Sequence, residues 1–263
     1  MVLMTHMARF FTLSLLLACI AVGDTILLDD DFSHGTTDGW TIDGATDMVN
    51  GVTAIVDPIV NPPPASITHP HNDPRIDYDG VLFPKDRGDY VQLNRFSDAV
   101  LASPDGFNVD RALVPACVVI RFTTASPSIT AYFQTLETDK TLKMPQYAVY
   151  RDGTTNITDY DEFRFTGDVT NPVFTIESDT PGSEVMYEIL LPSMNATAFK
   201  GLLLDSGYDL VTNAPYARPV YVGIGDSITM SAGHQSMSYE TYPWKFARAR
   251  GMEVYNIAVS GAK

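Results

Sequence analysis

One serine in this chain stands in a setting that could make its hydroxyl a nucleophile. Ser227 follows Gly225 and Asp226 directly after the apolar run Tyr221 to Ile224. A serine hydroxyl attacks an ester when a base takes its proton and N–H groups stabilise the oxyanion that forms. Open α/β folds keep such sites on turns at the carboxyl ends of strands. Ser227 is therefore the residue at which this sequence indicates chemistry.

The residues around this serine have the pattern of strand, loop, helix and strand. Residues 220–224 predict a buried strand, residues 239–250 a helix that Gly251 ends, and residues 253–258 a second strand. This order is one βαβ unit, the first of a parallel doubly wound sheet. Ser227 would then follow the carboxyl end of the first strand.

Two blocks in this region resemble those of the SGNH (GDSL-type) hydrolases. Gly225 to Thr229 is similar to the first block of that family, and Val254 to Ala262 is similar to the second. The resemblance implies a flavodoxin-like α/β domain without cofactor or metal. It also implies that Ser227 is the nucleophile, and that the backbone N–H groups of Ser227 and Gly261 form part of an oxyanion hole. The different elbow of α/β-hydrolases is not met, because Thr229 stands in place of its second glycine.

The motifs that complete an SGNH site come after the second block, and we find neither in this part of the chain. They are an asparagine in Gly-x-Asn-Asp and a histidine in Asp-x-x-His, whereas the sequence stops at Lys263. The segment Asp31 to His34 is a literal Asp-x-x-His near the N-terminus, and His234 follows Ser227 by seven residues. We expect neither histidine to be the base. Residues 220–263 are thus expected to be an incomplete SGNH domain with little turnover alone, whether as a fragment, a partial gene model or a shortened product.

Residues 24–213 predict strands and turns without a long helix. Residues 129–133 alternate as a half-buried strand does, and Asp152-Gly153 is a strong hairpin signal. Short apolar runs at this spacing predict a jelly-roll-like antiparallel β-sandwich, which a proline-bracketed linker over 214–219 joins to the hydrolase part. Residues 121–130 and 187–193 resemble the sandwich that precedes the hydrolase domain in some secreted SGNH carbohydrate esterases. This resemblance implies acyl esters of carbohydrates as substrates, acetyl esters above all.

A sandwich of this kind also suggests a different function, that of a carbohydrate-binding module without catalysis. Its aromatic candidates for stacking on a sugar are Trp40, Tyr132 and Tyr147. A structural or adhesive surface protein is a third interpretation, in which the Gly-Asp-Ser sequence is accidental.

The N-terminus has the pattern of a secretory signal peptide over residues 1–23. Arg9 precedes the apolar run 10–20, and Ala21 to Gly23 supply small residues for cleavage. The run is too short to span a bilayer. We expect a secreted or extracytoplasmic protein, with a lipoprotein anchored at Cys19 as the alternative. The second cysteine, Cys117, is then unpaired and expected to be buried.

The charge balance limits the partners. A net charge of -15, from 17 basic and 32 acidic residues, argues against nucleic acid and anionic membranes. The pair His69 and His71 could bind a metal, and the acidic runs 29–31 and 77–79 could bind calcium, but loop histidines and solvated turns are the expected states. Asn156 and Asn195 begin glycosylation sequons. The sequence gives no indication of oligomeric state.

Overall fold

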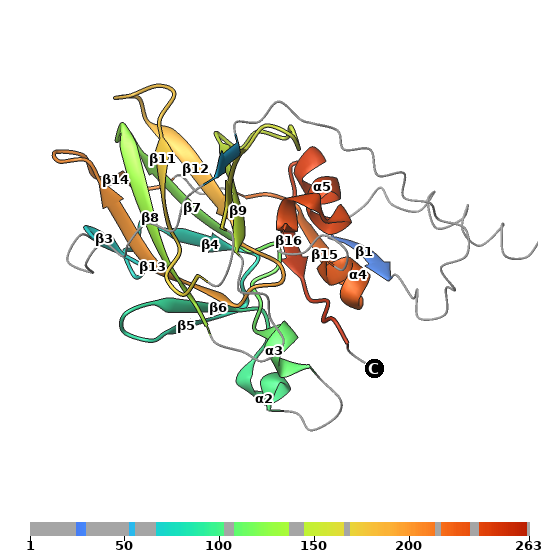
Figure 1. The fold of residues 1–263 in the computed structure, drawn as a ribbon. Helices are drawn as coiled ribbons and strands as arrows, with labels where there is room; N and C mark the ends of the chain where they lie inside the picture. The colour runs from blue at the N-terminus through green and yellow to red at the C-terminus, as the bar shows by residue number, and fades with distance from the viewer. Residues whose placement is uncertain are drawn as a thin grey trace, which may run out of the picture.

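The computed structural model describes residues 25–29, 53–55, 67–102, 108–136, 145–165, 169–213, 217–231 and 237–261. Strands dominate these ranges, in two large sheets and one small parallel sheet (Figure 1). The prediction of a sheet-rich, largely antiparallel chain is confirmed. No helix in the described ranges is long and apolar enough to cross a membrane. The predicted signal peptide, Cys19, His34, Trp40 and His234 lie outside these ranges.

The first large sheet has seven strands within the described residues. Their spatial order is β14 (Leu210–Val211), β7 (Val119–Thr124), β12 (Val185–Leu190), β9 (Gln146–Arg151), β10 (Asp161–Arg164) and β2 (Thr53–Ile55), and β4 (Asp77–Asp79) also pairs with β7. Neighbouring strands are antiparallel, except that β10 and β2 are parallel.

The second large sheet has six strands in the described part of the chain, and every pair is antiparallel. Their order is β11 (Val173–Glu177), β8 (Ser128–Thr135), β13 (Thr197–Leu204), β6 (Val91–Asn94) and β5 (Phe83–Asp86), and β3 (His69–Pro70) also pairs with β13. Two short helices, α2 (Asp98–Leu101) and α3 (Val109–Ala112), connect β6 to β7.

The two large sheets share one hydrophobic core. Side chains alternate between the faces of a strand, so Ile120 and Phe122 of β7 enter the same buried cluster as Phe133 of β8 and Phe174 of β11. Tyr147 lies in this core as well, with its ring centroid 4.6 Å from that of Phe133, and it is fully buried. The prediction that Tyr147 could stack on a sugar is therefore wrong, because apolar packing between the sheets uses its whole ring.

The opposite face of the seven-stranded sheet packs against the C-terminal elements. Val119, Tyr150 and Leu190 form a buried cluster with Trp244 of helix α5 (Tyr242–Ala249). The Trp244 indole Nε1 donates a hydrogen bond to the Tyr150 hydroxyl at 2.9 Å. The structure thus has three layers in the order six-stranded sheet, seven-stranded sheet and C-terminal elements.

The small sheet is parallel throughout. Strand β15 (Val220–Ile224) lies between β1 (Thr25–Asp29) and β16 (Glu253–Asn256). Between β15 and β16 the chain forms α4 (Ser227–Met230), the 3-10 turn η2 (Ser238–Glu240) and α5. The helix predicted over 239–250 is divided at Thr241, because Pro243 favours a helix start at that point.

Strand β1 lies in the range 24–213 that the sequence assigned to the sandwich, but its partner is β15. The run Thr25 to Leu28 is nearly continuously apolar, which is typical of parallel strands covered on both faces. The limits of the domains and of the linker stay predictions.

Four other candidate residues have definite environments. Asp77 and Asp79 belong to a strand and both accept hydrogen bonds from Arg121, so they are paired carboxylates and not a solvated turn. Of the two sequons, Asn156 is exposed and Asn195 is fully buried. Only Asn156 is accessible for glycosylation in the folded chain.

Candidate active site

Ser227 begins a short helix directly after the central strand of the parallel sheet. Strand β15 ends at Ile224, and Asp226 caps α4 by accepting a hydrogen bond from the Ile228 N–H at 3.0 Å. Ser227 is the first residue of that helix and is half-buried. The cap fixes the turn, so the Ser227 hydroxyl has a defined place at the carboxyl end of β15.

Gly225 leaves room for the side chain of Thr229. A Cβ atom at position 225 would lie 2.3 Å from the Thr229 Oγ1 atom and 2.9 Å from its Cβ atom. Thr229 is buried, and its hydroxyl hydrogen-bonds the Tyr242 hydroxyl at 2.8 Å. The first block therefore needs glycine here for space, and the close approach sets the tightness of the turn.

The second block continues from β16 along the same edge of the sheet. The Ile257 N–H donates to the Gly223 carbonyl at 2.8 Å, and the Val259 N–H donates to the Gly225 carbonyl at 3.2 Å. The chain then turns at Gly261, which is exposed and has a φ of 76°. Because β15 and β16 are parallel neighbours, Ser227 and Gly261 both follow carboxyl ends at one edge.

Asn256 connects the two blocks. Its side-chain Nδ2 donates to the Thr229 carbonyl at 2.9 Å, and its Oδ1 accepts from the Ala258 N–H at 3.1 Å. Asn256 is buried, so both bonds are protected from water. Sequence reasoning assigned no role to Asn256, although a buried amide at the end of an apolar strand is a signal that could have indicated one.

Arg95 lies beneath the second block and was also missed. It follows β6 of the six-stranded sheet, is 1% exposed, and donates to the backbone carbonyls of Asn256, Ala258 and Val114. No carboxylate in the described ranges pairs with it. Burial lowers the pKa of Arg95 to about 10, so its guanidinium stays protonated at neutral pH.

Comparisons with known proteins give the fold. No family model and no curated protein matches the sequence. The structure is similar to a salicylyl-acyltransferase from a tetracycline biosynthetic pathway, with a TM-score of 0.60 and 20% identity over 72% of this chain and 54% of that one. It is also similar to a GDSL-like lipase from Bacteroides ovatus, with a TM-score of 0.53 and 17% identity over 73% of this chain and 56% of that one. The chain shares their fold.

A family two carbohydrate esterase from Cellvibrio japonicus is more distant, with a TM-score of 0.49 and 16% identity over 73% of this chain and 51% of that one. The chain spans about half the length of these solved structures.

The described residues hold no histidine beside Ser227. His69 hydrogen-bonds Asp73 at 3.2 Å, and His71 hydrogen-bonds Asp86 at 3.1 Å, both next to the six-stranded sheet. Each histidine has its own carboxylate partner, and no group of three metal-ligating side chains occurs among the described residues. The Ser227 hydroxyl likewise has no hydrogen-bond partner in the described ranges.

Cys117 lies behind the site but is not a second nucleophile. Burial raises the pKa of its thiol, so the group stays protonated, and its Sγ lies 3.5 Å from Asn256 Nδ2. This agrees with the buried, inert cysteine that the sequence predicts.

Proposed function

We propose that Ser227 is the nucleophile of an SGNH-type esterase or acyltransferase that acts on acyl esters. The observation that carries the proposal is the capped Ser227 turn after β15, beside the Gly261 turn that follows the adjacent strand. The fold shared with an acyltransferase and a GDSL-like lipase supports it. In this reaction the Ser227 oxygen attacks the acyl carbonyl carbon, and the alcohol of the ester leaves. Water or a second alcohol then takes the acyl group.

The proposed reaction needs donors that stabilise the oxyanion and a base that takes the proton of Ser227. The backbone N–H groups of Ser227 and Gly261 are the proposed donors to the oxyanion. The proton of Ser227 must pass to a base outside the described residues. General bases contribute roughly 10²–10⁴-fold to such rates. We therefore propose that Ser227 turns esters over only slowly wherever that base is not in place.

The proposed substrate is an acyl ester of a carbohydrate, with acetyl as the acyl group. Three exposed apolar side chains, Ile224, Ile228 and Tyr242, lie on the elements around Ser227 and suit an uncharged ester better than an ionic one. A sandwich before the parallel sheet fits the sequence resemblance to carbohydrate esterases. Export through residues 1–23 belongs to the same proposal.

Free imidazole can act as an external base in place of a histidine and so tests Ser227 directly. We expect p-nitrophenyl acetate to leave an acetyl group on Ser227 of the full chain in the presence of imidazole, detected by peptide mass spectrometry. The variant Ser227→Ala should show none, whereas Ser260→Ala, a half-buried serine in the second block, should behave as wild type. Equal acetylation of the Ser227→Ala protein would refute the nucleophile. Serine-dependent turnover without imidazole would contradict the proposed slow turnover and would show that the chain supplies its own base.

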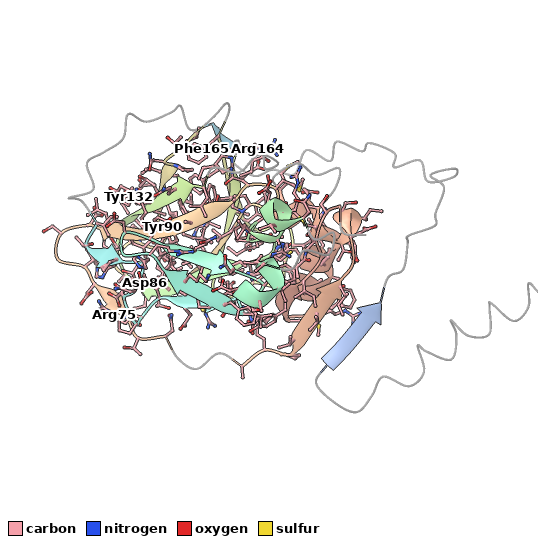
Figure 2. All side chains as sticks on the ribbon, turned by 90° about the horizontal axis from the view of Figure 1, so that it is seen from below. Arg75, Asp86, Tyr90, Tyr132, Arg164 and Phe165 are labelled. Atoms are coloured by element: carbon pink, nitrogen blue, oxygen red, sulfur yellow. The ribbon has the colours of Figure 1, made fainter. Side chains whose placement is uncertain are left out.

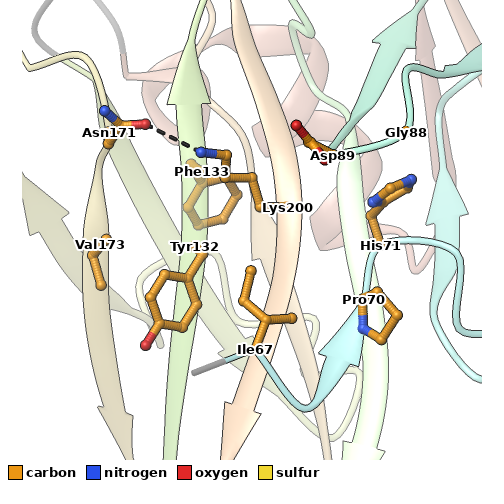
Figure 3. Close-up of a pocket in the computed structure, with 10 residues that line it drawn as sticks. All are labelled: Ile67, Pro70, His71, Gly88, Asp89, Tyr132, Phe133, Asn171, Val173 and Lys200. Carbon is orange, nitrogen blue, oxygen red and sulfur yellow. Dashed lines mark hydrogen bonds between the residues drawn. The ribbon is translucent and has the colours of Figure 1, made fainter. Parts of the chain in front are cut away.

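A second candidate function, carbohydrate binding by the sandwich, is favoured by a cavity of about 640 Å³ beside the six-stranded sheet (Figure 3). Such volumes suit small ligands. The six-stranded sheet lies on the side of the molecule away from the parallel sheet (Figure 1), and Tyr132, which lines the cavity, lies toward that end in Figure 2. The cavity is lined by Ile67, Pro70, His71, Gly88, Asp89, Tyr132, Phe133, Asn171, Val173 and Lys200.

A β-bulge places the lysine of this cavity. The register of β13 against β8 shifts between Phe199 and Gly201, so Lys200 is the extra residue, and its Nζ donates to Asn171 Oδ1 at 3.3 Å. Gly201 has a φ of 144°, and a Cβ there would lie 2.5 Å from the His69 carbonyl oxygen. The cavity thus combines a charged donor, Lys200, and a charged acceptor, Asp89, with apolar lining residues. This combination suits neutral sugar hydroxyls, because each hydroxyl can both donate and accept a hydrogen bond.

The sugar-binding proposal predicts that Lys200→Met weakens the binding of cellohexaose or xylohexaose by at least about tenfold, since one charged hydrogen bond is worth roughly that much. Isothermal titration calorimetry of the full chain measures the affinity. Ile228→Ser, at the Ser227 edge, is the matched control and should bind as wild type. A loss caused by Ile228→Ser alone would place sugar binding at the parallel sheet and reject the cavity.

A further inference from the structure

Arg95 makes an unusual set of contacts for a buried arginine. Its Nε donates to the Val114 carbonyl at 2.7 Å, its Nη1 donates to the carbonyls of Asn256 and Ala258, and its Nη2 donates to the Arg111 carbonyl at 3.2 Å. Every one of these acceptors is backbone. A guanidinium carries five donors in a rigid plane, so it fixes the relative positions of the carbonyls that it joins.

These carbonyls belong to two segments that lie far apart in the sequence. Arg111 belongs to α3 and Val114 follows it, in the connection from β6 to β7. Asn256 and Ala258 belong to the second block. The contact between these two segments continues at Gly261, where an added Cβ would lie 3.4 Å from Nδ2 of Asn108, the residue that caps α3. The Gly261 turn therefore packs against a segment that Arg95 itself anchors.

The second block in turn supports the first. Asn256 Nδ2 donates to the Thr229 carbonyl in α4, and the Ser260 N–H approaches the Met230 sulfur at 3.2 Å. A displacement of residues 256–260 would move the Gly261 N–H relative to Ser227. Oxyanion donors act only when they lie close to the position of the developing charge.

We infer that Arg95 is a positioning residue, through which the sandwich sets the geometry of the Gly261 turn beside Ser227. The catalytic meaning of this inference rests on the proposed function. It predicts that Arg95 acts on residues 256–261 and leaves the core between the two large sheets unchanged.

Amide hydrogen exchange of the full chain tests the inference without needing activity. In Arg95→Lys, which keeps the charge but not the planar fork, the Ile257 and Val259 N–H groups should exchange at least about tenfold faster. The Phe133 N–H, which donates to the Pro172 carbonyl in the sandwich, should not change. Arg87→Met is the matched control, because the exposed Arg87 side chain hydrogen-bonds only the Gln92 side chain in the described part of the chain.

Two results would overturn the inference. One is unchanged exchange at Ile257 and Val259. The other is equal acceleration at Phe133, which would show a general loss of stability.

Imidazole-dependent acetylation of Ser227 should also fall in Arg95→Lys and not in Arg87→Met. If the wild-type chain takes no acetyl group at all, the proposed function fails, and the exchange rates still decide whether Arg95 positions the turn.

Discussion

Glu188→Gln is expected to lower the free energy of unfolding by about 3–5 kcal/mol, the usual cost of leaving a buried charge without its partner. The Glu188 carboxylate accepts from Arg248 Nη1 at 2.7 Å and from Arg218 Nη2 at 2.8 Å. The side chains of Glu188 and Arg248 are each 1% exposed, so water cannot solvate the arginine that loses its carboxylate partner. Arg248 also lies 4.2 Å above the Tyr150 ring, which holds it in place.

Urea denaturation measures this loss as a lower midpoint with an unchanged slope. Lys245→Gln is the control, because its ion pair with Glu240 is about one-third exposed on both sides and should contribute less than about 1 kcal/mol. The double variant Glu188→Leu with Arg248→Met should lose less than the sum of its single changes, since an apolar pair needs no counter-charge. A Glu188→Gln protein as stable as Lys245→Gln would show that packing around Trp244 alone holds the layers together.

Gly225→Ala is expected to cost about 1–3 kcal/mol, because the new methyl group overlaps a buried side chain. Thr229 cannot move away easily, since its hydroxyl bonds Tyr242 and its carbonyl bonds Asn256. The turn must shift instead and carry Ser227 with it. A shift of about 1 Å at a reacting group can cost roughly 10²-fold in rate, so imidazole-dependent acetylation should fall as well.

Gly223→Ala provides the comparison from the same strand. A Cβ at Gly223 would meet its nearest atom, Thr229 Cγ2, at 3.5 Å, which is ordinary van der Waals contact. We expect both its melting temperature and its acetylation to stay close to wild type. Equal damage from the two substitutions would mean that the loss of glycine, and not contact with Thr229, disturbs the turn.

The local features of the site were predictable from sequence because they depend on neighbours in the chain. An apolar run followed by Gly225 and a capping Asp226 indicates a strand and a tight turn, and the structure has both. The alternation of residues 129–133 likewise indicates strand β8.

The contacts that hold the layers together were not predictable in the same way. Arg95, Glu188 and Arg248 are far apart in the sequence, and charged residues are normally assigned to the surface. Burial is tolerable only because the fold supplies partners, which are backbone carbonyls for Arg95 and the mutual ion pair for Glu188 and Arg248. Tyr147 shows the reverse error, since an aromatic side chain on an exposed face and one in the core have the same local pattern.

The pairing of β1 with β15 sets a constraint on the order in which the chain can fold. Thr25 of β1 lies opposite Val220 of β15, so β1 cannot pair until nearly the whole chain up to β15 is present. Contacts between such distant residues form slowly, because the loop between them must close first. The strands of the two large sheets between them can pair beforehand, and we expect the parallel sheet to assemble last, on a surface that the seven-stranded sheet has already formed.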